Sequence, residues 1–214
     1  MKLGERLECV YSLVPDGCRF ADIGTDHGYL PVKLLLDGVV TCAAASDINE
    51  KPLESARRNA EKYGVKNISI FVSDGFDSLA FDFDTAAICG MGGRLICALL
   101  SRCPEVRGKR FILQPMRNDE LVREYLWTHG FNIEKELFAL EDGKPYAVIS
   151  CFMDGSYRPF TAKETYLGLS AEMNEAHRAY DMKLFRRAKN ALKGKSESKT
   201  AEDLIQTIGE RYGI

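Results

Sequence analysis

The stretch Phe20-Ala-Asp-Ile-Gly-Thr-Asp-His-Gly-Tyr-Leu30 decides the fold of this chain. Its apolar beginning is typical of a buried strand, and Gly24 followed by Thr25 and Asp26 indicates a turn into a helix. In open α/β sheets, ligands bind where the carboxyl ends of strands meet helix N-termini, because free backbone N–H groups and a crevice coincide there. The stretch therefore predicts an α/β fold with a ligand site at this turn.

Composition limits the class of protein. The chain has 214 residues, of which 45% are hydrophobic and 28% charged, and its net charge is −2. This length suffices for one main domain and an appendage. No segment approaches the ~18 uninterrupted apolar residues of a membrane span, so we expect a soluble, cytoplasmic protein. The seven cysteines form no C-x-x-C pair, so we expect neither a disulfide framework nor a bound metal.

Strand and helix patterns alternate along the first part of the chain. Strands are predicted at residues 18–23, 39–48, 68–73, 85–89 and 110–114, and helices at 3–13, 25–38, 49–64, 93–100 and 118–129. Two β-rich runs then follow, residues 131–140 and 146–153, joined by Glu141-Asp-Gly-Lys-Pro145 in a way typical of a hairpin. These patterns predict a seven-stranded, mostly parallel sheet with one antiparallel strand.

The end of the chain is predicted to be helical. Apolar residues recur every three or four positions from Tyr166 to Ala191, which indicates one amphipathic helix that packs on a partner. A polar break at residues 193–199 precedes a shorter helix around Leu204 and Ile208, so we expect an αα-hairpin. We therefore divide the chain into an α/β domain, residues 1–157, and a helical segment, residues 158–214.

Acidic residues close three successive strands. Asp22 and Asp26 flank the first turn, where they would repel a dinucleotide pyrophosphate and favour a cation. The turn also lacks the G-x-G-x-x-G spacing that dinucleotide binding requires. Asp47 is placed to accept hydrogen bonds from a ribose, and Asp74 from an adenine amino group. A cation, a ribose and an adenine together describe S-adenosylmethionine. The alternative is that these acids only cap helices.

Five motifs resemble those of one enzyme family. They are Asp22-Ile-Gly-Thr-Asp-His-Gly-Tyr-Leu-Pro31, Ser46-Asp-Ile-Asn49, Ser73-Asp-Gly75, Cys89-Gly-Met-Gly-Gly93 and Leu113-Gln-Pro115. Through them the chain resembles class I S-adenosylmethionine-dependent methyltransferases, and among these the bacterial tRNA (adenine22-N1)-methyltransferase family. The resemblance implies a Rossmann-like methyltransferase fold followed by a helical, coiled-coil-like segment.

The resemblance also implies a cofactor site. Asp22 would reach the methionine amino group directly or through water, the backbone at Gly24 would approach the methionine part, and Asp47 would hold the ribose. Ile48 would pack on the adenine, and Asp74 would bind the adenine amino group. The other expected cofactor contacts are Thr25, Gly28, Gly75 and Gly90. At Gly28 we expect alanine more often in the family.

By resemblance, the methyl acceptor lies at the end of the fourth predicted strand. Residues 89–93 lack the Asn/Asp-Pro-Pro-aromatic motif with which related enzymes bind the exocyclic amino group of adenine. A pocket without a side-chain acceptor suits a ring nitrogen, because adenine N1 already has an in-plane lone pair and mainly requires in-line positioning. We therefore expect methylation at N1 of an adenine in tRNA, adenine 22 by resemblance.

Three residues of the first turn are the catalytic candidates. Asp26 would stabilise the cationic product or take the amino proton, and His27 is the second candidate for this role. His27 could instead order the turn by bonding a backbone carbonyl. Tyr29 would stack on the base. Alternatively, its ring would only pack against a helix. Because N1 lies on the Watson–Crick edge, an exposed adenine in a folded RNA corner is a better substrate than a duplex.

Basic residues are expected to hold the RNA. Six of them lie between Lys183 and Lys195 without an acidic residue, a run that alone is typical of a solvated helix face. Beside a nucleic-acid methyltransferase domain it becomes a candidate phosphate-binding surface. The expected substrate contacts are Met91, Gly92, Gly93, Arg94, Gln114, Pro115, Arg117, Lys183, Arg186 and Arg187. Arg94 and Arg117 could instead pair with neighbouring acids.

Two other functions stay open from the sequence. One is a methyltransferase of the same fold that acts on another RNA, a small molecule or a protein. The other is a non-catalytic, cofactor-binding interaction module. We expect the protein to be a monomer or a weak dimer.

Overall fold

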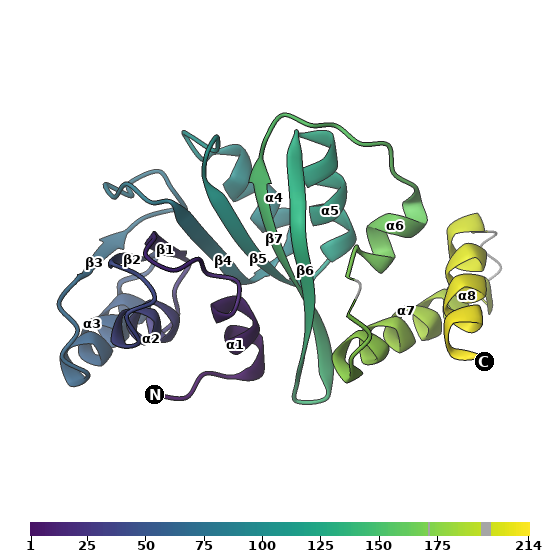
Figure 1. The fold of residues 1–214 in the computed structure, drawn as a ribbon, viewed down its shortest axis with the longest axis horizontal. Coiled ribbons are helices and arrows are strands. Elements are labelled where there is room, and N and C mark those ends of the chain that lie inside the picture. The colour runs from purple at the N-terminus through teal and green to yellow at the C-terminus, as the bar shows by residue number, and fades with distance from the viewer. Residues whose placement is uncertain (171, 194–197) are drawn as a thin grey trace.

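The computed structural model describes residues 1–170, 172–193 and 198–214. Its centre is a seven-stranded sheet in the order β3-β2-β1-β4-β5-β7-β6 (Figure 1). The strands are β1 (Arg19–Ile23), β2 (Cys42–Asp47), β3 (Ile68–Val72), β4 (Thr85–Gly92), β5 (Arg110–Arg117), β6 (Phe131–Glu141) and β7 (Lys144–Met153). Strand β7 runs antiparallel to the other six strands, which confirms the predicted sheet.

Helices cover both faces of the sheet. They are α1 (Glu5–Tyr11), α2 (Tyr29–Leu36), α3 (Glu50–Lys62), α4 (Gly93–Ser101), α5 (Asp119–Thr128), α6 (Ala162–Leu167), α7 (Glu175–Lys193) and α8 (Lys199–Tyr212). Side chains alternate along each strand, so Phe20 packs in the cluster of α1 and α2, whereas Ala21 and Ile23 pack in that of α4 and α5. None of the helices in the described ranges is long and apolar enough to span a membrane.

The strands β4 and β5 are longer than predicted. They continue as a parallel pair beyond residues 89 and 114, with Met91 opposite Pro115 and Gly92 opposite Arg117. The register shifts on both sides of Met91, and Gly90 adopts the left-handed conformation, with φ of 75°. Glycine adopts this conformation at no steric cost. The predicted acceptor segment, residues 90–92, therefore belongs to the carboxyl end of β4 instead of a free loop.

Helix α2 begins later than the predicted residue 25. Its first residue is Tyr29, and Gly28 occupies its cap position. Asn49 lies at the cap of α3, but its side chain makes no capping bond. Its backbone N–H instead donates to the Asp47 carboxylate, 2.7 Å away. A carboxylate two residues upstream therefore closes this turn.

The single long C-terminal helix predicted from Tyr166 is wrong. Gly168, with φ of 71°, ends α6, and α7 begins only at Glu175. A left-handed glycine stops a helix whatever the apolar spacing around it, and Leu169 and Met173 are exposed in the intervening segment. Helices α7 and α8 contact each other as the expected hairpin. Within the predicted break at 193–199, residues 194–197, which include Lys195, lie outside the described part.

The C-terminal helices pack on the β6–β7 edge of the sheet (Figure 1). Phe138 of β6 and Ala147 of β7 share one apolar cluster with Tyr180 and Leu184 of α7. The guanidinium of Arg123 on α5, which is completely buried, also donates to Glu136 of β6 and to the Thr165 carbonyl. The division at residue 157 stays a prediction, and the two segments share a core.

Candidate active site

A cleft of about 550 Å³ opens at the carboxyl ends of β1 and β4. The three catalytic candidates line it together with Asp22, Gly24, Thr25, Gly28, Gly90 and Met91. Its opposite wall contains residues that the sequence analysis missed, namely Gly4, Arg6 and Leu7 around the start of α1, Met116 of β5 and Glu141 of β6. The fold therefore brings the first turn, the acceptor segment and the N-terminal helix to one site.

The turn after β1 is anchored to β2. The backbone N–H groups of Gly24 and Thr25 both donate to the Ser46 carbonyl, at 2.8 Å each. Gly24 has a φ of 75°, and a Cβ there would lie 2.0 Å from the Met91 methyl carbon. Glycine suits this position because its backbone lies in the left-handed region, and the flexible Met91 side chain fills the space that a Cβ would occupy.

Gly28 is held by both conformation and packing, so alanine does not suit this position in this chain. Its φ is 66°, and a Cβ would lie 2.8 Å from that of Ala56 on α3. We expect Gly28→Ala to lower the free energy of unfolding by roughly 2–4 kcal/mol, the sum of left-handed strain and overpacking. Denaturant unfolding measures this loss.

The matched control is Gly38→Ala. Gly38 has a φ of 71°, but a Cβ there would meet nothing within 4 Å. Its replacement should cost only the strain of about 1–2 kcal/mol. Equal losses in the two variants would show that the contact with Ala56 has no energetic role.

Asp22 is a buried carboxyl in the wall of the cleft. It is 7% exposed, and burial raises its pKa from 3.8 to about 6. A hydrogen bond with Thr25 lowers this pKa, and the negative charge of Asp47 raises it further. A nearby cation would favour the ionised form and bring the pKa down again. The site therefore fits a positively charged ligand group such as the amino group of S-adenosylmethionine.

The three catalytic candidates form one exposed group at the cleft. The Nε2 of His27 lies 3.3 Å from the Asp26 carboxylate, whose side chain is 83% exposed. The ring centroids of His27 and Tyr29 are 5.2 Å apart. Tyr29 is 42% exposed, which argues against simple helix packing. The His27 ring lies against the Asp26 carboxylate, and both its catalytic and its turn-ordering role stay predictions.

The other predicted cofactor contacts lie at the neighbouring strand ends, outside the lining of this cleft. The Ser73 N–H donates to the Asp47 carbonyl at 2.9 Å, which fixes the ends of β2 and β3 side by side. Ile48 is exposed beside them. Arg102 contacts both oxygens of Asp74, at 2.9 and 3.0 Å, and lowers its pKa. This arginine partner was not predicted.

Gly75 is a tightly packed position at the end of β3. Its φ is 64°, and a Cβ there would lie 2.5 Å from a methyl carbon of Leu99. Glycine therefore lets the chain turn close to α4 immediately after Asp74.

A buried network supports the acceptor segment. The Oε1 of Gln114 accepts from Arg6 Nη1 at 2.7 Å and from the Gly90 N–H at 3.1 Å. Its Nε2 donates to the Pro115 carbonyl, and Arg6 also pairs with Glu141 at 2.5 Å. Since Gln114 is completely buried and Pro115 is buried beside it, the structure gives them a supporting position instead of an exposed contact surface.

Gly93 and the two predicted arginines lie near this segment. A Cβ on Gly93 would lie 2.2 Å from the Asn118 carbonyl oxygen, so this glycine allows α4 to begin against the β5–α5 connection. Arg94 and Arg117 are exposed. Within the described ranges neither lies within 4 Å of a carboxylate, so the predicted alternative of pairing with acids is not seen.

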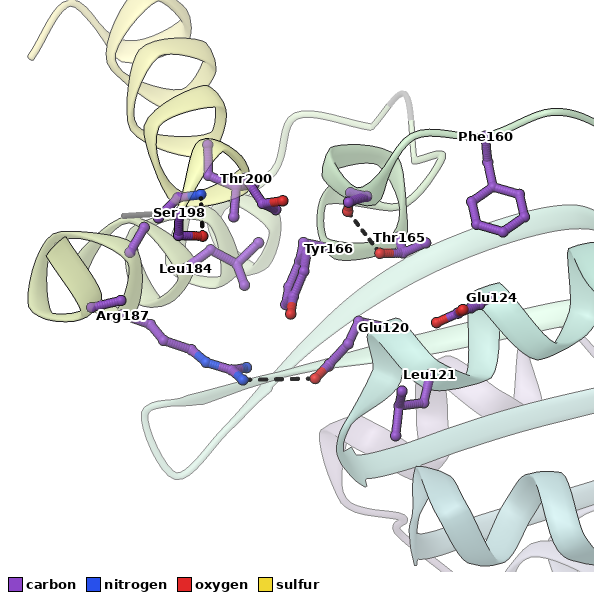
Figure 2. Close-up of a pocket in the computed structure, with 15 residues that line it drawn as sticks. Glu120, Leu121, Glu124, Phe160, Thr165, Tyr166, Leu184, Arg187, Ser198 and Thr200 are labelled. Carbon is purple, nitrogen blue, oxygen red and sulfur yellow. Dashed lines mark hydrogen bonds and ion pairs between the residues drawn. The ribbon is translucent and has the colours of Figure 1, made fainter. Parts of the chain in front are cut away.

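The basic residues of α7 lie on two different surfaces. Lys183 and Arg186 line a groove beside the β6–β7 hairpin. Arg187 instead lines a separate cavity of about 500 Å³, where it lies 3.7 Å from Glu120 and 5.7 Å from the ring centre of Tyr166 (Figure 2). The predicted basic run is therefore not one continuous contact surface.

Comparison with known proteins identifies the family. The model described as "Methyltransferase domain" matches residues 3–149. This chain belongs to the methyltransferase-domain family. The tRNA (adenine(22)-N(1))-methyltransferase of Bacillus subtilis is 37% identical to it over 153 residues, which are 70% of this chain and 64% of that protein. The match thus spans less than two thirds of that relative's length.

Solved structures resemble this methyltransferase-domain protein over nearly the whole chain. Sp1610 of Streptococcus pneumoniae, in complex with S-adenosyl-L-methionine, is 31% identical with a TM-score of 0.82, covering 98% of this chain and 99% of its own. M. capricolum TrmK, in complex with S-adenosyl-homocysteine, is 25% identical with a TM-score of 0.81, covering 99% and 98%. The described residues of the present chain contain no group of three or more His, Cys, Asp or Glu side chains that could hold a metal ion.

Proposed function

We propose that this protein transfers a methyl group from S-adenosylmethionine to N1 of an adenine in tRNA, adenine 22 by similarity to its relatives. One observation supports this most strongly. A single cleft joins the buried carboxyl of Asp22 to an acceptor segment, Gly90 and Met91, that offers no side-chain hydrogen-bond acceptor. Such a site accommodates a cationic methyl donor on one side and a ring nitrogen on the other.

The strand ends would hold the cofactor. Asp22 would bind its amino group, Asp47 its ribose, and Asp74 with Ile48 its adenine. When bound, S-adenosylmethionine supplies an electrophilic methyl group on a sulfonium. The backbone at Gly24 would lie against the methionine part once the Met91 side chain, whose methyl carbon fills the space of a Gly24 Cβ, turns aside.

The acceptor side would position the target base. The N1 lone pair would form the new bond to the methyl carbon as the carbon–sulfur bond of the sulfonium breaks and its electron pair returns to sulfur, so the base would take over the positive charge. Asp26 at the mouth of the cleft then stabilises that charge or takes a proton from the amino group, assisted by its contact with His27. Tyr29 offers an exposed ring for stacking, and Arg6 with Gln114 holds the Gly90 backbone in place.

We propose that the protein acts on tRNA in the cytoplasm as a monomer or weak dimer. Arg94 and Arg117, exposed beside the acceptor segment, would contact phosphates of the bound RNA. The same site would also serve a methyltransferase for another RNA, a small molecule or a protein. A non-catalytic module would bind cofactor without modifying tRNA.

Nucleoside mass spectrometry of tRNA from a strain without this protein separates these functions. We expect 1-methyladenosine to be absent from the tRNA, and to return with the wild type but not with Asp26→Ala. Asp16→Ala, which removes an exposed acid outside the cleft, is the matched control and should restore the modification fully. An unchanged 1-methyladenosine content in the strain without the protein would contradict the proposal.

A further inference from the structure

A basic groove lies next to the catalytic cleft, between the tip of the β6–β7 hairpin and α7. Its volume is about 380 Å³. The hairpin contributes Lys144 and Tyr146 to its lining, and α7 contributes Lys183 and Arg186. These two α7 residues are three positions apart, so their side chains share one face of the helix. Figure 1 shows the hairpin tip beside the first part of α7.

The cations of this groove have no acidic partners. Within the ranges that the structure describes, none of Lys144, Lys183 and Arg186 lies within 4 Å of a carboxylate, and no acidic residue lines the groove. The neighbouring Arg187, by contrast, lies against Glu120 and outside the groove. Three uncompensated cations around an aromatic ring suit an anionic ligand that also offers a flat surface.

The groove adjoins the cleft at one shared lining residue. Met116, which is 39% exposed at the end of β5, lines both of them. Arg6 of the cleft also lies with its guanidinium 5.4 Å from the ring centre of Tyr146 in the groove. A chain molecule whose reacting unit occupies the cleft would therefore enter the groove directly with its next units.

We propose that this groove binds the phosphate backbone of the unpaired RNA segment next to the methylated adenine, with Tyr146 contacting a flanking base. The proposal rests on the function proposed above. A basic groove with an aromatic side chain is the usual arrangement for single-stranded RNA. Lys144 was not among the expected substrate contacts, because it lies in the predicted hairpin connection at residues 141–145.

The test uses the full chain with Lys144→Gln, Lys183→Gln and Arg186→Gln combined. The matched control is Lys62→Gln, Lys66→Gln and Lys199→Gln, which removes three exposed cations that neither line the groove nor belong to the basic run of α7. Fluorescence anisotropy measures the binding of unmodified tRNA over a range of salt concentrations. Calorimetry measures the binding of S-adenosylmethionine, and initial rates give kcat and KM.

In the groove variant we expect the Kd for tRNA to rise about tenfold or more, and the salt slope to fall in magnitude by about 2. KM for tRNA should rise, while kcat and the affinity for S-adenosylmethionine stay unchanged. The control should bind tRNA like the wild type. If the two variants lose equal affinity, or the groove variant loses none, the groove proposal is overturned although the function stands. If the wild type neither binds nor methylates tRNA, the proposed function fails as well.

Discussion

Arg123→Ala is expected to lower the free energy of unfolding by about 3–5 kcal/mol. The Arg123 guanidinium is completely buried and donates to Glu136 at 2.6 and 2.8 Å, to Asp119 at 2.8 Å and to the Thr165 carbonyl at 2.6 Å. Burial lowers its pKa, but Glu136, Tyr180 and Asp119 outweigh burial and raise the pKa well above its ordinary value. Its removal would leave the Glu136 carboxylate, also fully buried, without its cation.

This loss should extend beyond the α/β domain. Glu136 also accepts from the Leu169 N–H at 2.7 Å, and Tyr180 of α7 donates to the Asp119 carboxylate. The network thus joins α5, β6, the α6–α7 connection and α7. Denaturant unfolding should show the C-terminal helices destabilised together with the sheet.

The control is Arg117→Ala, which removes an exposed arginine with no acidic partner in the described ranges. It should change the free energy of unfolding by less than about 0.5 kcal/mol. The double variant Arg123→Met with Glu136→Leu should recover part of the loss of Arg123→Ala, because the fully buried Glu136 charge is removed with its cation and Asp119 keeps the Tyr180 hydroxyl as a donor. A loss below about 1 kcal/mol for Arg123→Ala would contradict this description of the network.

Asp22→Asn is expected to stabilise the protein at neutral pH while it weakens cofactor binding. Folding raises the pKa of Asp22 from 3.8 to about 6, so the folded protein favours the neutral form. The stability from this carboxyl is fully present below pH 3.8 and is lost as pH rises through about 6. Above that pH the ionised group costs roughly 3 kcal/mol, most of which the asparagine variant should regain.

Calorimetry with S-adenosylmethionine measures the other half of this prediction. The variant should bind at least about tenfold more weakly at pH 8, because it lacks the charge that favours the amino group. The wild type should also bind more weakly as pH falls through about 6, where Asp22 becomes protonated. Equal affinity of Asp22→Asn and wild type at pH 8 would show that Asp22 does not bind the cationic group.

Local sequence signals predicted the sheet and the row of acids at its edge. The turn at residues 20–30, Asp47 and Asp74 each lie beside the strand that positions them, so spacing along the chain was sufficient. The methyltransferase-domain match supports the same reading of the fold. The roles of the individual residues stay predictions.

Contacts between distant segments could not be predicted in this way. Arg6 meets Glu141 and Gln114, which are 135 and 108 positions away, and no periodic pattern links such residues. A glutamine within the apolar run 110–114 was nevertheless a signal, since a buried amide requires partners. In the sequence alone, Arg123 likewise resembles an exposed charge on a helix. Only the fold brings Glu136 of β6 beside it. Gly168 within the apolar stripe was the overlooked sign that α6 and α7 are separate.

The most direct test of the central claim is methylation of an unmodified tRNA transcript by the purified protein with methyl-labelled S-adenosylmethionine. The RNA is digested to nucleosides, and mass spectrometry identifies the labelled product. We expect 1-methyladenosine as the labelled nucleoside, and its loss when the target adenine is replaced by guanine. Label in N6-methyladenosine, label in another nucleoside, or no label in the wild-type reaction would contradict the account.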